Sequence, residues 1–226
     1  MEIKPIAHIH TDFKEKFGIP RQSGRVKELT AKIVFEKEFR NPDALRAIEG
    51  FDYLWLIFDF SLSHKTKWSP TVRPPRLGGN EHVGVFASRS PFRPNPLGLS
   101  SVKFERIEHT EKEGDVLIVS GADLLDGTPI FDIKPYLPSC DCHTGAKGGY
   151  ADRFTEYKLA VKISEGALNE FPKDKLSALI GCLEEDPRPS YQDDDREYGM
   201  SFAGFNVKFK VKENTLTVIG CEKIDK

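Results

Sequence analysis

The run Y-L-W-L-I-F-D-F at residues 53–60 decides the fold class of this chain, because it is long, almost wholly apolar and rich in aromatic side chains. Such a run favours a strand, and its composition predicts that both faces of the strand are buried. Outward from it, shorter apolar or alternating runs occur at residues 27–35, 102–104 and 116–119. Several short strands with turn signals between them predict a barrel or a strongly curved sheet.

One helix is signalled in this part of the chain. Asn41 has the residue type of an N-cap, Pro42 suits the first helical position, and Gly50 suits the position after the last turn. These signals predict a helix over residues 42–49.

The pattern changes after Tyr136. Residues 173–182 have helical spacing, and residues 204–211 alternate, turn at Glu213 and Asn214, and alternate back over residues 215–220, which predicts a β-hairpin. The sequence therefore predicts a mainly β protein. Its expected parts are an N-terminal β-barrel domain over residues 1–140, a linker over residues 141–152 and a small C-terminal α+β domain over residues 153–226.

Composition narrows the class of protein. The 226 residues include 38% hydrophobic residues and 16 Phe, enough for a core without disulfides or metals. No apolar run approaches the roughly 20 residues of a membrane span, and the first residues do not resemble a secretory signal. The four cysteines lack framework or zinc-like spacing, Cys140, Cys142 and His143 included, so we expect free thiols, no metal and a cytoplasmic location.

Charge is unevenly distributed along a chain whose net charge is −2. Residues 64–106 contain eight Lys or Arg against two Glu, a net +6, whereas residues 184–197 contain seven acidic against two basic residues, a net −5. A local basic patch on a neutral protein is typical of a nucleic acid held at one place. An ordinary solvated face would give the same count, so both interpretations stay open.

The basic segment contains a loop of unusual composition. Residues 84–101 read G-V-F-A-S-R-S-P-F-R-P-N-P-L-G-L-S-S. The strand-like run at residues 83–87 is followed here by three prolines and two arginines, and Arg93 and Asn95 each precede a proline that restricts their backbone. A loop this stiff holds guanidinium and amide groups at set positions and favours a binding site over a plain surface crossover. Segments that pair Gly or Pro with polar residues recur at residues 18–24, 72–80 and 124–136. No G-x-G-x-x-G follows a strand and no phosphate-binding P-loop motif occurs, so neither nucleotide fingerprint is present.

These four segments, with D-P-R-P-S-Y-Q at residues 186–192 and Y-G-M at residues 198–200, resemble the TsaA-like family, the tRNA methyltransferases called TrmO. The resemblance implies a TsaA-like β-barrel that binds S-adenosyl-L-methionine. It also implies methylation of N6 of threonylcarbamoyladenosine next to the anticodon, with the anticodon loop of tRNA as partner. It further implies a homodimer with the cofactor pocket near the subunit interface; on composition and ligand spacing we expect neither a membrane nor a metal as partner.

The resemblance places the cofactor against residues of three segments and of the end of the long strand. They are Pro20, Arg21, Gln22, Ser61, Leu62, Arg89, Leu99, Leu125, Asp126, Gly127 and Thr128. On local grounds alone, Asp126 and Gly127 are equally a hairpin turn, and Arg21 is equally a surface arginine.

The acceptor nitrogen is urea-like and a poor nucleophile, so groups that orient it or relay its proton would help. Asn95, Tyr136 and Lys134 are the candidate catalytic residues, although Lys134 and Tyr136 also suit a strand end. Cations for the threonyl carboxylate and the phosphates would come from Arg93, with Arg73 and Arg76 further out, and Lys134 could share this task. The sequence leaves open which group moves the proton.

Two other functions fit the same sequence. One is an S-adenosylmethionine-binding module that recognises RNA without chemistry, and the other is a methyltransferase with a different acceptor, because a fold does not fix its substrate. Residues 186–192 and Tyr198 are expected to shape the substrate side or the contact between the two parts.

Overall fold

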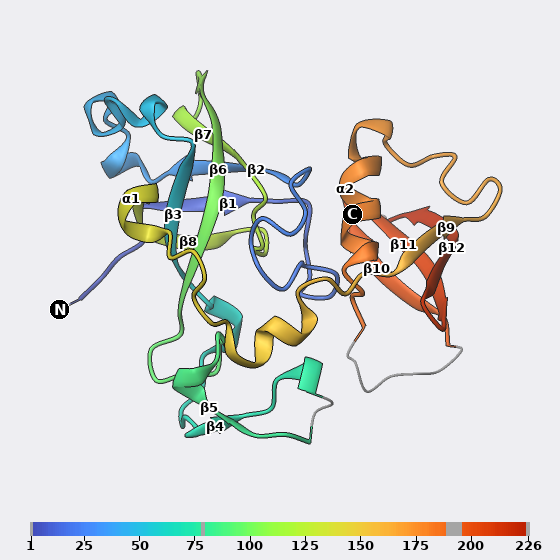
Figure 1. The fold of residues 1–226 in the computed structure, drawn as a ribbon. Helices are drawn as coiled ribbons and strands as arrows, with labels where there is room; N and C mark the ends of the chain where they lie inside the picture. Colours follow the sequence, from blue (N-terminus) through green and yellow to red (C-terminus); the bar gives the residue numbers. More distant parts are fainter. Residues whose placement is uncertain (1, 78–79, 189–195, 225–226) are drawn as a thin grey trace.

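The computed structural model of the chain describes residues 2–77, 80–188 and 196–224, and strands predominate in it (Figure 1). Two lobes are visible: a barrel with a β-hairpin arm below it, and a smaller sheet with one helix against it. The mainly β fold with a small C-terminal α+β part is therefore confirmed.

Six antiparallel strands form the barrel, and each pairs with two neighbours because β8 pairs back with β1. In order around the barrel they are β1 (Ala7–His10), β2 (Thr30–Phe35), β7 (Gly114–Ser120), β6 (Leu97–Thr110), β3 (Tyr53–Asp59) and β8 (Thr128–Pro135). The runs predicted as strands at residues 27–35, 102–104 and 116–119 all contribute to it. Their alternate apolar side chains fill one contiguous core inside the barrel.

The expectation that β3 is buried on both faces is wrong. Leu54, Leu56 and Phe58 are buried in the barrel core, but Trp55 and Ile57 on the other face are only partly covered. A barrel encloses one face of each strand, so outward side chains are covered only where another segment crosses. Trp55 is such a case, because its indole Nε1 donates to Asp141 Oδ2 at 2.9 Å.

The predicted helix over residues 42–49 is also wrong, although its cap is confirmed. Asn41 Oδ1 accepts from the Asp43 backbone N–H at 3.0 Å. Two short 3-10 helices follow, η2 (Pro42–Leu45) and η3 (Ile48–Gly50), because Ala47 between them is left-handed with φ 70°. Neither buries a residue, and helices in proteins depend largely on packing of an apolar face.

The strand-like run at residues 83–87 forms a strand only in part. β5 (Val83–Gly84) pairs with β4 (Thr71–Val72) in a two-stranded arm, and the chain then turns into η6 (Val85–Ala87). The remaining 3-10 helices are η1 (Lys37–Phe39), η4 (Ser61–Ser63), η5 (Pro75–Leu77), η7 (Gly149–Phe154) and η8 (Lys173–Lys175).

The C-terminal lobe is a four-stranded sheet in the order β10 (Tyr198–Phe202), β11 (Phe205–Lys212), β12 (Thr215–Lys223) and β9 (Ala160–Ile163), with β9 parallel to β12. The predicted hairpin is confirmed as β11 and β12. The predicted helical run is confirmed as η8 followed by α2 (Leu176–Glu184), whose Leu179 and Leu183 are fully buried.

The N-terminal segment between β1 and β2 packs into the core of the C-terminal lobe. Phe13, Val26 and Leu29 belong to that core, and the Phe13 ring lies 5.1 Å from the Phe202 ring. The Lys175 ammonium also pairs with Asp12 at 2.6 Å. The core of the C-terminal lobe is therefore shared with the N-terminal part of the chain, and the division at residues 140 and 153 stays a prediction.

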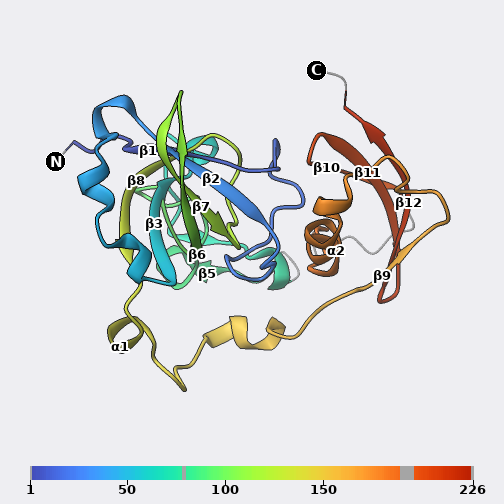
Figure 2. The same cartoon turned by 90° about the horizontal axis from the view of Figure 1, so that it is seen from above.

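A long connection joins the lobes. After β8 the chain forms α1 (Pro138–Asp141) and η7 and crosses to β9 along one side of the molecule (Figure 2). All four cysteines are free. In the described ranges, no cluster of His, Cys, Asp and Glu could hold a metal ion, and no helix is long and apolar enough to cross a membrane. The acidic residues 193–195 lie outside the described residues.

Candidate cofactor pocket

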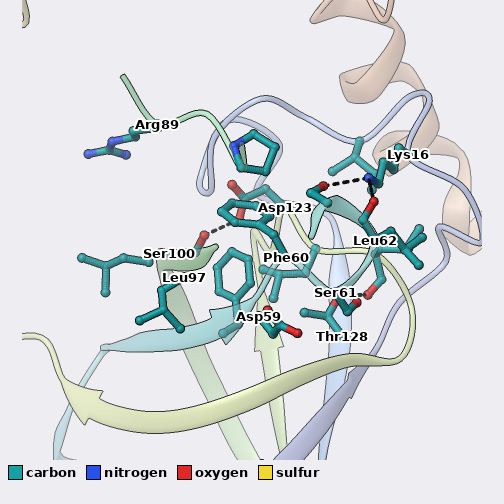
Figure 3. Close-up of a pocket in the computed structure, with 18 of the residues that line it drawn as sticks. Lys16, Asp59, Phe60, Ser61, Leu62, Arg89, Leu97, Ser100, Asp123 and Thr128 are labelled. Carbon is teal, nitrogen blue, oxygen red and sulfur yellow. Dashed lines mark hydrogen bonds between the residues drawn. The ribbon is translucent and has the colours of Figure 1, made fainter. Parts of the chain in front are cut away.

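A pocket of about 750 Å³ opens at the end of the barrel where β3 ends and β6 begins (Figure 3). This volume lies within the range of about 300–1,000 Å³ that small-molecule sites occupy. Its walls come from four separate segments: residues 16–22, residues 58–63, the loop rich in proline and arginine at residues 88–96 (the Pro/Arg loop) with the start of β6, and the turn before β8. The structure thus brings together three of the four motifs that the sequence singles out.

Most of the predicted site residues line this pocket. From the predicted cofactor set these are Pro20, Arg21, Gln22, Ser61, Leu62, Arg89, Leu99, Leu125 and Thr128, and from the predicted acceptor set they are Arg93 and Asn95. The pocket does not include Asp126, Gly127, Lys134, Tyr136, Arg73 or Arg76.

Aromatic rings form the apolar wall. The rings of Phe58 and Phe60 meet edge to face, with centroids 5.0 Å apart. Gly98 makes room for this arrangement, since a Cβ there would lie 2.1 Å from the Phe58 ring. Leu62 and Leu99 at the same pocket are largely exposed, at 66% and 55%. A flat apolar ligand would find the Phe60 ring, supported by buried Phe58, and aliphatic surface here.

Two of the predicted arginines are held by partners. Arg89 donates from Nη1 to Gln22 Oε1, and the rest of its exposed guanidinium can bind a ligand. Arg93 donates from Nη1 to the carbonyls of Ser88 at 3.0 Å and Ser90 at 3.4 Å, so it braces its own loop.

Arg21 connects the pocket to the second lobe. Its Nη2 donates to the Arg188 carbonyl at 2.9 Å. Burial, followed by the nearby charge of Arg76, lowers the pKa of Arg21, while Asp186 and Glu185 act in the opposite direction. Arg21 is thus part of the contact between lobes as well as of the pocket wall.

Three charged residues of the pocket were missed by sequence reasoning. Lys16 donates to the Leu62 carbonyl at 3.0 Å and to Ser63 Oγ at 2.9 Å, and Asp59 pairs with His64 at 2.7 Å. The third, Asp123, directly precedes the predicted segment at residues 124–136.

Asp123 sits in the floor of the pocket. Its Oδ1 accepts from Ser100 Oγ at 2.6 Å. Burial raises the pKa of this carboxyl, against the opposing effects of the Ser100 hydrogen bond and of Arg89. Its position one residue before a quoted motif was the available signal, but nothing local distinguishes it from a solvated aspartate.

Asp126 and Gly127 face the N-terminal segment instead of the pocket. The Thr11 backbone N–H donates to Asp126 Oδ1 at 3.0 Å, and the Gly127 N–H donates to the Ile9 carbonyl at 2.8 Å. Burial opposes ionisation of Asp126, but the Lys14 and Thr11 hydrogen bonds outweigh it and lower the pKa. Their part in cofactor binding stays a prediction.

Lys134 and Tyr136 lie toward the other end of β3. Lys134 is opposite Trp55 in the register, whereas the pocket begins at Phe58. The Tyr136 ring packs against Trp55 with centroids 5.6 Å apart, and Lys134 pairs with Asp132 at 2.9 Å. In a single chain these two candidates are therefore apart from Asn95, and their catalytic role stays a prediction.

Arg73 and Arg76 contact different parts of the protein. Arg73 Nε donates to His82 Nε2 at 2.9 Å on the β4–β5 arm. Arg76 donates to the Glu185 carbonyl at 3.1 Å, and its guanidinium lies 4.9 Å from the centre of the Tyr157 ring. Arg76 therefore faces the second lobe, and RNA binding by either residue stays a prediction.

The D-P-R segment forms a buried polar cluster at the contact between lobes. Arg188 Nε donates to Asp186 Oδ1 at 2.9 Å, and Tyr157 Oη donates to Asp186 Oδ2 at 2.9 Å. Both partners of the ion pair are under one-tenth exposed. Residues 189–192 of the same motif lie outside the described residues.

Two family models match the chain. Residues 8–142 match the tRNA-methyltransferase O N-terminal domain, and residues 156–224 match the TrmO C-terminal domain. Together the two matches span most of the chain.

Several known proteins are similar over much of its length. The tRNA (adenine(37)-N6)-methyltransferase of Escherichia coli strain K12 is 37% identical over 230 residues, which cover 98% of this chain and 97% of that protein. The protein of the same name from Eikenella corrodens is 46% identical over 169 residues, with 73% and 93% covered. A Pseudomonas aeruginosa relative, provisionally named an S-adenosylmethionine-dependent methyltransferase, is 39% identical, with 88% and 87% covered. A crystal structure of TrmO from P. aeruginosa aligns with a TM-score of 0.81 at 30% identity and covers 99% of this chain and 97% of that chain.

Proposed function

This chain belongs to the tRNA-methyltransferase O family, and we propose that it transfers a methyl group from S-adenosylmethionine to N6 of adenine 37 in tRNA. The pocket at the end of the barrel carries this proposal, because it gathers the Pro/Arg loop, the segment at residues 18–24 and the turn before β8 around one cavity. These segments are the ones on which the family resemblance rests.

The pocket also fits the chemistry of the cofactor. Its Phe60 ring and leucines suit an adenine. When bound, the cofactor supplies an electrophilic methyl group, so the main task of the protein is alignment of donor and acceptor. The stiff Pro/Arg loop and its Arg93 brace keep the wall in place for that task.

We propose threonylcarbamoyladenosine as the acceptor. Its N6 is weakly nucleophilic, so a group that orients the carbamoyl oxygen would help, and exposed Asn95 at the pocket can do this. The basic segment at residues 64–106 would hold the surrounding phosphates of the anticodon loop. A cytoplasmic location is part of this proposal.

Transfer of labelled methyl groups tests the function. The purified protein, given radiolabelled S-adenosylmethionine, is expected to label tRNA from cells that make threonylcarbamoyladenosine and not tRNA from cells that cannot. Label in both pools would contradict this acceptor while supporting tRNA methylation. Absence of label from both pools, together with absence of cofactor binding by calorimetry, would refute the methyltransferase proposal.

We also propose a homodimer in which a second copy covers the exposed Leu62 and Leu99 and brings its Lys134 and Tyr136 toward the pocket. Sedimentation equilibrium is expected to give twice the chain mass of 25.5 kDa. Arg89→Ala and Tyr136→Phe alone should each lose most activity, whereas an exchanged mixture should regain about one quarter, the statistical share of intact sites in a two-site dimer. A monomer, or a mixture without recovery, would contradict this arrangement.

A further inference from the structure

The pocket contains two side chains of opposite charge to which the proposed function assigns no joint role. Asp123 lies between β7 and β8 in the pocket floor, and Arg89 lies in the Pro/Arg loop at the wall (Figure 3). Within the described ranges the two form no ion pair with each other, yet Arg89 is near enough to act on the charge of Asp123. A ligand between them would meet a cation and an anion.

Each charge is held by a neutral partner. Ser100, itself only 3% exposed, donates to Asp123 Oδ1 at 2.6 Å, and Gln22 accepts from Arg89 Nη1. A bond to a buried hydroxyl fixes the carboxylate without neutralising it. The Asp123 carboxylate, oriented by Ser100, can therefore present a negative charge to the cavity.

The other charged groups at the pocket have protein partners, beginning with Arg21, whose Nη2 donates to the Arg188 carbonyl. The Lys16 ammonium donates to Leu62 and Ser63, and Asp59 pairs with His64 at 2.7 Å. Arg93 is held by the carbonyls of its own loop. Arg89 differs from Arg21 and Arg93 because it is exposed, and its charge acts on Asp123, so these two are the groups of opposite sign that a ligand can use.

We propose that Asp123 and Arg89 bind the amino-acid end of the methyl donor: the α-ammonium donates to Asp123, and Arg89 donates to the α-carboxylate. This inference rests on the proposed function and assigns Asp123 and Ser100 a binding role. It leaves the partly exposed Phe60 ring with Leu62 and Leu99 as apolar surface for the adenine.

The cost of burying Asp123 supports the arrangement. Burial raises the pKa of this carboxyl, and the Ser100 hydroxyl, the backbone of Asp123, Arg89 and the backbone of Ser23 only partly offset that effect. An ammonium group in contact with the carboxylate favours its charged form and removes part of this cost. The ligand would thus complete an interaction that the free pocket leaves partial.

Calorimetry with three probes tests the assignment in the full-length protein. Asp123→Asn is expected to weaken S-adenosylhomocysteine about 10–100-fold, the usual size of a lost charged hydrogen bond. The same variant should bind 5′-methylthioadenosine, which lacks both charged groups, within about 2-fold of the wild type. Arg89→Ala should weaken S-adenosylhomocysteine but not decarboxylated S-adenosylmethionine, whereas Asp123→Asn should weaken both. Asp115→Asn, the same change at a distant carboxylate bonded to His109, is the matched control.

The pH dependence gives a second readout. Asp123 must be ionised to hold the ammonium, so the affinity for S-adenosylhomocysteine should fall as pH decreases through the raised pKa of this carboxyl. The Asp123→Asn variant should lack that decrease. Ser100→Ala should lower the affinity less than Asp123→Asn does, since it removes only the orienting bond.

Unchanged S-adenosylhomocysteine affinity in Asp123→Asn would overturn the inference, and a simultaneous loss of turnover would assign Asp123 to proton transfer instead. Equal weakening of all three probes would also overturn it, because it would indicate a damaged pocket. In either case wild-type binding of S-adenosylhomocysteine and labelling of tRNA would leave the proposed function standing. Loss of both in the wild type would contradict the function itself.

Discussion

Phe13→Ala is expected to destabilise the whole protein by about 3–5 kcal/mol, the usual cost of truncating a buried phenylalanine. Phe13 is 1% exposed and lies in the core of the C-terminal lobe, although its place in the sequence is just after the first barrel strand. The lost contacts include the Phe202 ring, whose centroid is 5.1 Å away. The substitution therefore weakens both the core of the C-terminal lobe and the packing of the N-terminal segment against that lobe.

Urea unfolding followed by two probes measures this effect. Both tryptophans, Trp55 and Trp68, lie outside the C-terminal lobe, whereas far-ultraviolet circular dichroism reports on both lobes. A shared core predicts that the two transitions coincide and shift together to lower urea. Phe86→Ala, at a 74% exposed position, is the matched control, with an expected change within about 0.5 kcal/mol. A wild-type midpoint for Phe13→Ala, or two separated transitions in the wild type, would contradict the shared core.

Asp186→Asn is expected to cost about 3–5 kcal/mol, because it removes the negative partner of a buried ion pair. Arg188 donates to this carboxylate from Nε at 2.9 Å and from Nη2 at 3.1 Å, and Tyr157 donates to it at 2.9 Å. Asparagine keeps the shape and tolerates the left-handed φ of 51° at this position, so the change isolates the charge.

Thermal and urea unfolding check the size of this loss against an exposed pair. Asp43→Asn removes the partner of Arg46, and both side chains there are more than 70% exposed. That control is expected to change stability by about 0–1 kcal/mol, the range for surface ion pairs. Similar stabilities of the two variants would show that the buried cluster contributes no more than a surface pair.

Sequence reasoning was most successful where the signal was local. The stiff Pro/Arg loop, the turn before β8 and the segment around Pro20 could be selected from composition, and residues of all three line one pocket. Sequence reasoning failed where a site residue depends on a hydrogen bond to a distant segment of the chain. Asp123 acquires its role from the Ser100 hydroxyl of another strand, and Lys16 from the turn at Ser63. Neither partner can be inferred from neighbours in the chain.

Local patterns were enough to predict β2, β3, β6 and β7, the β11–β12 hairpin, the N-cap at Asn41 and the rigid loop, because alternation, turn residues and proline act over a few positions. That residues 42–49 form two 3-10 turns could be learned from the folded chain alone, where Leu45 and Ile48 are only partly buried and no residue of the segment is fully buried. The folded chain also shows that β3 is buried on one face, that Phe13 joins the second lobe, and that Tyr136 stands apart from Asn95. In each case burial and hydrogen-bond partners depend on which distant segments meet: closure of the barrel covers one face of β3, and packing of the segment after β1 against the C-terminal lobe buries Phe13.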